Sequence, residues 1–127
     1  MVLFDELGVL DISLLEGEFG KIVTDEIIIT QERIEHIKNH HPEDCNIFVQ
    51  YAKEAVQKPD IIIKDSKNKG TAFMIKRLNN TNLNVVVRVV LQTDNSEYKN
   101  SVMTFYRIRD KNLEKLIKKN KIIYKKE

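Results

Sequence analysis

Four short segments of extended-chain character lie between residues 60 and 108, and they constrain the fold more than any other feature. They span residues 60–64, 71–78, 83–92 and 100–108, and the stretches between them are rich in Asp, Asn, Ser, Thr and Gly. These residues favour tight turns, and the stretches are short enough to close hairpins. The pattern therefore predicts a four-stranded antiparallel meander.

Helical periodicity precedes and follows this meander. A first helix is expected from Thr30, a good N-cap residue, to about Pro42. A second is expected over residues 44–57 and a third over residues 110–119, because their apolar residues recur at three- and four-residue spacing. Residues 121–124 are a candidate edge strand. We predict an α+β fold in which N-terminal helices pack on one face of a four-stranded antiparallel sheet, with a C-terminal helix and the other face open.

The chain of 127 residues fits one domain. Residues 1–20 carry five carboxylates and no Lys or Arg, whereas the whole chain has a net charge of +2. We expect this acidic arm to be irregular or weakly stranded, and we assign residues 21–127 to a single domain. Residues 21–29 are expected to form two short strands around a turn at residues 24–26.

Two features bear on cellular location. No apolar run is long enough to span a bilayer. Cys45 is the single cysteine, so no intrachain disulfide can form and a reducing compartment is expected. We predict a cytoplasmic protein without a membrane partner.

The strand segments place polar side chains on one face of the predicted sheet. In residues 83–91 every odd position is apolar, so Arg88 belongs to the opposite face. In the last segment, strict alternation separates Ser101 from Thr104 and Tyr106. These hydroxyls share one face only if a bulge or the start of the strand reorients Ser101.

The first predicted helix carries a cluster of basic residues. Arg33, His36 and His40 fall within one narrow wedge of a helical wheel, beside the stripe that contains Ile34 and Ile37. A histidine at such a border has a restricted rotamer and can still reach a substrate, which suits proton transfer.

Other chemistries fit the sequence less well. His36 and His40 could bind zinc together with Cys45 or Glu43, but no further ligand motif supports this. The turn at residues 65–70 has lysines where a calcium loop needs oxygen ligands. No nucleophile elbow surrounds Ser101, and no glycine-rich phosphate loop occurs. We therefore expect no metal and no cofactor.

The remaining arrangement is a histidine with cations and hydroxyls. Cleavage of RNA through its own 2′-OH needs a base, an acid and groups that stabilise the charged phosphorane. His36 could serve as base or acid, and Arg88 or Lys76 could stabilise the charge. Arg33 and His40 could contact the substrate, and three hydroxyl residues could hold the phosphate or orient the histidine: Ser101, Thr104 and Tyr106.

These residues also carry a family resemblance. The stretch Thr-x-x-Arg-Ile-x-His-Ile-x-x-His-His-Pro-Glu at residues 30–43, Lys-Pro-Asp at 58–60 and Asn-Ser-Val-x-Thr at 100–104 resemble the phage-associated branch of the barnase–EndoU–colicin–RelE-like nuclease superfamily. The resemblance covers about residues 27–125 and leaves the acidic arm outside. It implies a small metal-independent endoribonuclease in which His36 is the helical catalytic histidine and Ser101 and Thr104 are polar residues of a late strand.

Two functions follow as hypotheses. The first is a toxin-like endoribonuclease of phage or mobile-element origin that acts on RNA. The second is a catalytically inactive binding or inhibitor protein on the same scaffold, which engages a nucleic acid or a host protein. An antitoxin or immunity protein is a possible partner of the first, and the acidic arm could fold over a basic groove and imitate phosphate.

Overall fold

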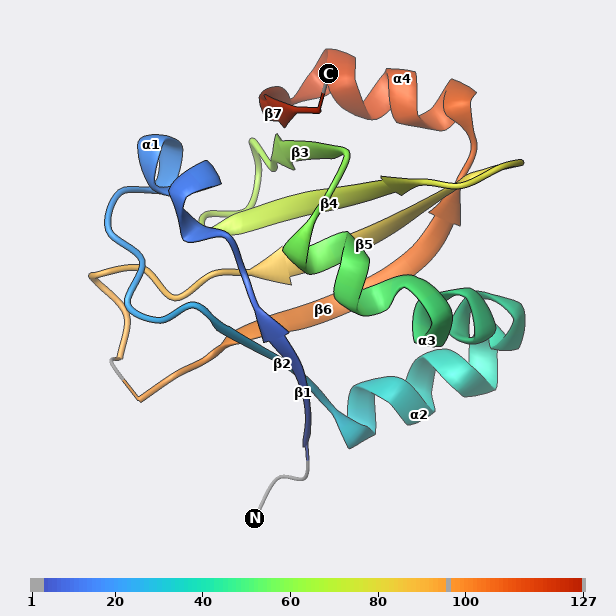
Figure 1. The fold of residues 1–127 in the computed structure, drawn as a ribbon, viewed down its shortest axis with the longest axis horizontal. Helices are drawn as coiled ribbons and strands as arrows, with labels where there is room; N and C mark the ends of the chain where they lie inside the picture. The colour runs from blue at the N-terminus through green and yellow to red at the C-terminus, as the bar shows by residue number, and fades with distance from the viewer. Residues whose placement is uncertain (1–3, 96, 127) are drawn as a thin grey trace.

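The computed structural model describes residues 4–95 and 97–126 as one α+β unit (Figure 1). Its elements follow one another along the chain as β1 (Phe4–Val9), a 3₁₀ turn η1 (Ile12–Leu14), α1 (Glu16–Phe19), β2 (Glu26–Thr30), α2 (Gln31–His40), α3 (Pro42–Gln57), β3 (Ile61–Lys64), β4 (Thr71–Arg77), β5 (Asn82–Arg88), β6 (Asn100–Ile108), α4 (Asp110–Lys119) and β7 (Lys121–Lys125).

The sheet is larger than predicted. Its described strands have the order β1-β2-β6-β5-β4-β3-β7, so there are seven strands rather than four. The predicted meander from β3 to β6 forms its centre, and every neighbouring pair within it is antiparallel. The expectation of an entirely antiparallel sheet is wrong, because β2 pairs with β6 in parallel. β7 adds an edge strand beside β3, as the sequence indicated.

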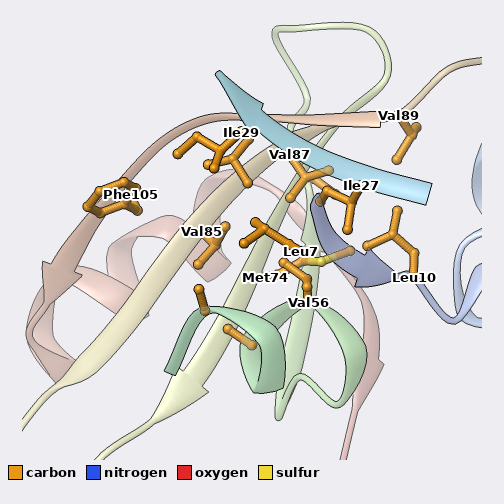
Figure 2. Packing of buried hydrophobic residues seen from close by; sticks show 14 of the residues in the cluster. Leu7, Leu10, Ile27, Ile29, Val56, Met74, Val85, Val87, Val89 and Phe105 are labelled. Atoms are coloured by element: carbon orange, nitrogen blue, oxygen red, sulfur yellow. The ribbon is translucent and has the colours of Figure 1, made fainter. Parts of the chain in front are cut away.

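The two long helices α2 and α3 come after β1 and β2 in the chain. The prediction that helices form the N-terminal part of the fold is therefore wrong. α3 covers one face of the sheet and buries Phe48, Ala52, Ala55 and Val56 against it. The rings of Phe48 and Phe105 stack with centroids 3.8 Å apart. Figure 2 shows the strand residues that meet this helix, and the odd positions of β5, such as Val85 and Val87, point into this core as predicted.

The opposite face is only partly open. α4 turns back over it after β6 and buries Leu113 in a second apolar cluster that contains Phe73, Val86 and Ile108. The prediction of a wholly open face is therefore wrong for the half beneath α4. The other half, around Arg88 and Thr104, is hollowed and lined by polar side chains.

The acidic arm is built into the fold. β1 pairs antiparallel with β2, and Leu7, Leu10 and Leu15 lie in the core under α3. Glu18 binds Lys64 and Lys121 with N–O distances of 3.4 and 2.9 Å, and its hydrogen bond with Lys121 lowers its pKa below the usual value. The predicted pair of strands in residues 21–29 is reduced to β2 and an isolated bridge between Ile22 and Leu91.

Local signals explain where α2 and α3 begin. The Thr30 hydroxyl accepts a hydrogen bond from the backbone N–H of Arg33 at 3.2 Å, as expected of an N-cap. Pro42 occupies the first turn of α3, where its missing N–H has no helical partner to lose. No helix of the described residues is long and apolar enough to cross a bilayer.

Candidate active site on the open half of the sheet

A β-bulge in β6 gathers the hydroxyl residues on one face. Val86 pairs with Thr104, but the next residue, Val87, pairs with Val102, so Met103 is the extra residue. Val102 and Phe105 consequently both enter the core under α3, although three positions separate them. Ser101, opposite Arg88, therefore shares the face of Thr104. A bulge of this kind was one of the two conditions under which Ser101 could share a face with Thr104 and Tyr106.

Arg88 lies at the centre of this face. It pairs across the sheet with Thr71 on one side and Ser101 on the other. Its guanidinium lies against Gly70, which has a φ of +74° and where a Cβ atom would collide with Arg88. Gly70 thus serves both the turn and the close approach of the arginine.

Two acceptors hold the Arg88 side chain. It donates one hydrogen bond to the Val89 carbonyl and another to the Asp94 carboxylate at 3.2 Å. Asp94 also accepts a hydrogen bond from the backbone N–H of Leu91 at 2.8 Å. That bond, followed by the contact with Arg88, holds the pKa of Asp94 below its usual value. Arg88 is thus a fixed cation with one carboxylate partner and about one-third of its side chain exposed.

A hollow of about 610 Å³ opens beside this arginine, and we call it the Arg88 hollow. Tyr106 and Thr104 line it from β6, and its apolar floor includes Phe73 and Val86. The Tyr106 hydroxyl accepts a hydrogen bond from the buried Asn84 amide at 3.0 Å, which leaves the hydroxyl proton available for a ligand. The cationic wall consists of Arg88, Lys67 and Lys69.

A second hollow, of about 500 Å³, adjoins the first, and we call it the His36 hollow. It is lined by His36, Ile37, His40, His41 and Thr104. α2 reaches this place because β2 pairs with β6 only at Ile27 and Ile28 and then passes directly into the helix. The His36 and His40 rings lie with centroids 4.7 Å apart, and both side chains are exposed.

Thr104 lines both hollows, so it joins the helical histidines to the Arg88 side of the sheet. A third hollow, of about 360 Å³, continues past Arg88 and contains Ser101. Ser101 donates a hydrogen bond to the Met103 sulfur at 3.8 Å. Six of the eight predicted site residues therefore lie along these three hollows: His36, His40, Arg88, Ser101, Thr104 and Tyr106.

Lys76 and Arg33 lie elsewhere. Lys76 packs at the end of α3 and forms ion pairs with Glu54 and Asp60 at 3.7 and 3.6 Å. Alternation along β4 explains this position. Ile75 points to the face under α4, so the next residue, Lys76, points to the face under α3. Arg33 contributes its backbone N–H to the cap of α2, and its side chain lines neither the Arg88 hollow nor the His36 hollow.

Sequence reasoning missed several residues of this surface. Lys67 and Lys69 come from the turn at residues 65–70, whose sequence was compared only with a calcium loop, and Thr71 is the first residue of β4. A run with two lysines and a glycine beside a strand was the available signal for a cationic wall. Asp94 gave no signal, because its role depends on Arg88 folding back toward the loop after β5.

Two observations concern the other chemistries, a metal site and a cysteine nucleophile. Among residues 4–95 and 97–126, no three His, Cys, Asp or Glu side chains gather closely enough to hold a metal ion. Burial, followed by the nearby charge of Asp44, raises the pKa of the Cys45 thiol. That shift disfavours the thiolate needed for nucleophilic attack.

Comparison with protein families agrees with this architecture. The model of the family described as phage-Barnase-EndoU-ColicinE5/D-RelE like nuclease2 matches residues 6–125. The chain belongs to this family. The match begins within β1, so it includes most of the acidic arm that the resemblance from residues 27 to 125 left outside. Comparisons with curated proteins and with solved structures found no match.

Proposed function

We propose that this nuclease-like protein is a metal-independent endoribonuclease that cleaves RNA through the 2′-OH, with the cytoplasm as its predicted location. One observation carries the proposal: Thr104 lines both the hollow of His36 and the hollow of Arg88. A phosphate at Thr104 would therefore have an imidazole on one side and a fixed guanidinium on the other.

The chemistry divides among these residues. In the proposed reaction His36 accepts the 2′-OH proton, the 2′-oxygen attacks phosphorus, and the bond to the 5′-oxygen breaks. The leaving oxygen takes up a proton, and the products are a 2′,3′-cyclic phosphate and a 5′-hydroxyl. Arg88 stabilises the charge of the phosphorane, and the hydroxyls of Thr104 and Tyr106 donate to its oxygens. Ser101 binds the chain on the far side of Arg88.

Arg88 is preferred to Lys76 for the charge-stabilising role, because Lys76 already has two carboxylate partners on the helix-covered side of the sheet. His40 is placed to contact the substrate, and it is also the imidazole next to His36. It is therefore our candidate for the second proton-transfer group.

The test is cleavage of a labelled single-stranded RNA in EDTA, with the 3′ ends of the products analysed for cyclic phosphate. His36→Ala should be at least about 10²-fold slower, the usual loss for a general acid–base group. Lys38→Ala is a matched control, since Lys38 is exposed on the same helix and lines neither hollow. Equal cleavage by wild type and His36→Ala rejects the assignment.

A binding protein without catalysis is the second candidate. The specific observation in its favour is the Arg88–Asp94 ion pair. Asp94 already neutralises part of the positive charge with which Arg88 would stabilise the phosphorane. Such a protein could engage a nucleic acid, an antitoxin or a host protein through the same face. Wild-type protein that binds RNA but yields no cyclic phosphate products would favour it.

A further inference from the structure

The basic residues of the chain are concentrated near its end. Residues 110–126 contain seven lysines and two carboxylates, whereas the whole chain has a net charge of only +2. The rest of the chain is therefore net negative. A polyanion that approaches this protein will be attracted mainly to the surface of α4 and β7.

The lysines of α4 form one exposed face. Leu113, Leu116 and Ile117 pack toward the sheet, so the opposite side of the helix faces solvent. Among the described residues, no carboxylate forms an ion pair with the ammonium groups on that side. These free lysines are Lys111, Lys115, Lys118 and Lys119.

The helix that carries these lysines packs next to the proposed active site. Leu116 and Ile117 pack against a cluster that includes Phe73 and Val86, and both of these residues also floor the Arg88 hollow. In Figure 1, α4 runs along the top of the view and ends beside β7.

A hydrogen-bonded latch connects the helix to the cationic wall of the hollow. The backbone N–H of Ser66 donates to Asn120 Oδ1 at 2.9 Å, and the Ser66 hydroxyl lies 3.0 Å from the same atom. Asn120 in turn donates to the Leu116 carbonyl at 2.9 Å. The turn with Lys67 and Lys69 is thereby tied to the C-terminal end of α4.

We propose that Lys67, Lys69 and the outer lysines of α4 form a track that binds the phosphate backbone of RNA beyond the nucleotides at the cleavage site. We call this surface the lysine track. The inference rests on the proposed ribonuclease function and extends it to a substrate longer than the site itself. A ten-residue helix is about 15 Å long, so the track reaches several nucleotides past the hollow.

The surface chemistry favours a nucleic acid over an acidic protein. Protein interfaces usually centre on exposed apolar or aromatic anchors. The exposed large hydrophobic side chains among the described residues are Val9, Val23, Val49, Tyr98 and Met103, and none belongs to α4 or β7. Lysines without such anchors bind phosphates through counterion release, which is independent of sequence.

The test compares two triple variants of the full chain that remove the same charge. The track variant is K115Q/K118Q/K119Q, and the control is K38Q/K53Q/K58Q. The three control lysines are exposed: Lys38 lies on α2, Lys53 lies on α3 and Lys58 directly follows α3. Fluorescence anisotropy measures binding of a 12-nucleotide and a 3-nucleotide 2′-O-methyl RNA, which cannot be cleaved, at several salt concentrations.

The track variant should bind the 12-nucleotide RNA about tenfold or more weakly, with a salt-dependence slope lower by about 2, because each lost phosphate contact contributes about 0.7. Its affinity for the 3-nucleotide RNA should stay within about twofold. An unchanged affinity for the long RNA overturns the track and leaves an acidic protein as the occupant. Equal losses in both variants, or equal losses for both lengths, also overturn it.

The two proposals fail in different ways. Loss of long-RNA binding in the track variant, without cyclic phosphate products from wild type, rejects the ribonuclease function and leaves the track intact. Cleavage that depends on His36, with the same length dependence in the track variant as in wild type, rejects the track alone.

Discussion

Arg88 shows how single residues determine this site. Its guanidinium is held by the Val89 carbonyl and by Asp94, and the absence of a side chain at Gly70 allows it to lie against the backbone. A fixed cation is effective in stabilising a transition state, because little reorganisation is needed during the reaction. The same ion pair also places a carboxylate next to the hollow that we propose binds phosphate, so the affinity expected of the site depends on both charges.

The Asp94 carboxylate makes part of the stability depend on pH. Since its pKa is lower in the folded protein than in the unfolded chain, its contribution is present above the unfolded pKa of about 3.9 and is lost as the pH falls through the folded pKa. We expect Asp94→Asn to be destabilised relative to wild type at pH 7, with a difference that shrinks below about pH 4. Urea unfolding of both proteins at pH 7 and at pH 3 measures this difference.

Asp25→Asn is the control, because Asp25 is exposed and its side chain has no bond among the described residues. A wild-type advantage over Asp94→Asn that is the same at pH 3 as at pH 7 would contradict the expectation.

The bulge in strand β6 determines which of its side chains face the core and which face the open half of the sheet. One extra residue, Met103, keeps Val102 and Phe105 in the core while it separates Ser101 from Thr104 along the strand. If Met103 were kept and the strand alternated regularly from Phe105, Val102 would turn out of the core and Ser101 would turn into it.

Deletion of Met103 tests this element. Regular alternation would then still place Val102 and Phe105 in the core and Ser101 and Thr104 on the open face, so the protein should fold. The distance between Ser101 and Thr104 would shorten by one residue, and we expect RNA cleavage to fall by about 10²-fold, the cost of a misplaced catalytic geometry. Circular dichroism and the cleavage assay separate the two effects.

Met103→Ala, which preserves the length of the strand, should lose much less activity than the deletion. If the deletion variant cleaves RNA as fast as wild type, the spacing provided by the bulge has no role in the site.

At the scale of the whole molecule, the acidic arm belongs to the core. Leu7, Leu10 and Leu15 are buried with the residues of α3 and the central strands. Glu18 binds Lys64 and Lys121 at the far edge of the sheet, and none of the arm's described residues, 4–20, lines the Arg88 hollow or the His36 hollow. This placement argues against the hypothesis that the arm covers the basic groove.

Leu15→Ala should therefore destabilise the whole protein. Leu15 is fully buried, and removing a buried leucine side chain typically costs about 2–5 kcal/mol. Val9→Ala, at an exposed position of β1, should change the free energy of unfolding by no more than about 0.5 kcal/mol. Chemical denaturation measures both, and a loss at Leu15 as small as that at Val9 would show that the arm is peripheral.

Local patterns were enough to predict the meander from β3 to β6, the helices α2, α3 and α4, and the edge strand β7. They also predicted the face of Arg88, because alternation along β5 is regular. They did not predict the place of β1 or the parallel pairing of β2 with β6, since both depend on contacts between residues far apart in the chain.

The sequence by itself determined the elements, the apolar faces and the residue types available for chemistry, because turn residues and hydrophobic periodicity act over a few residues. Only the tertiary structure decided that Thr104 joins the histidine and arginine hollows, that Lys76 is engaged elsewhere, and that the turn at residues 65–70 is latched to α4. These outcomes depend on long-range packing, in which a single bulge or a parallel pairing changes which side chains share a face.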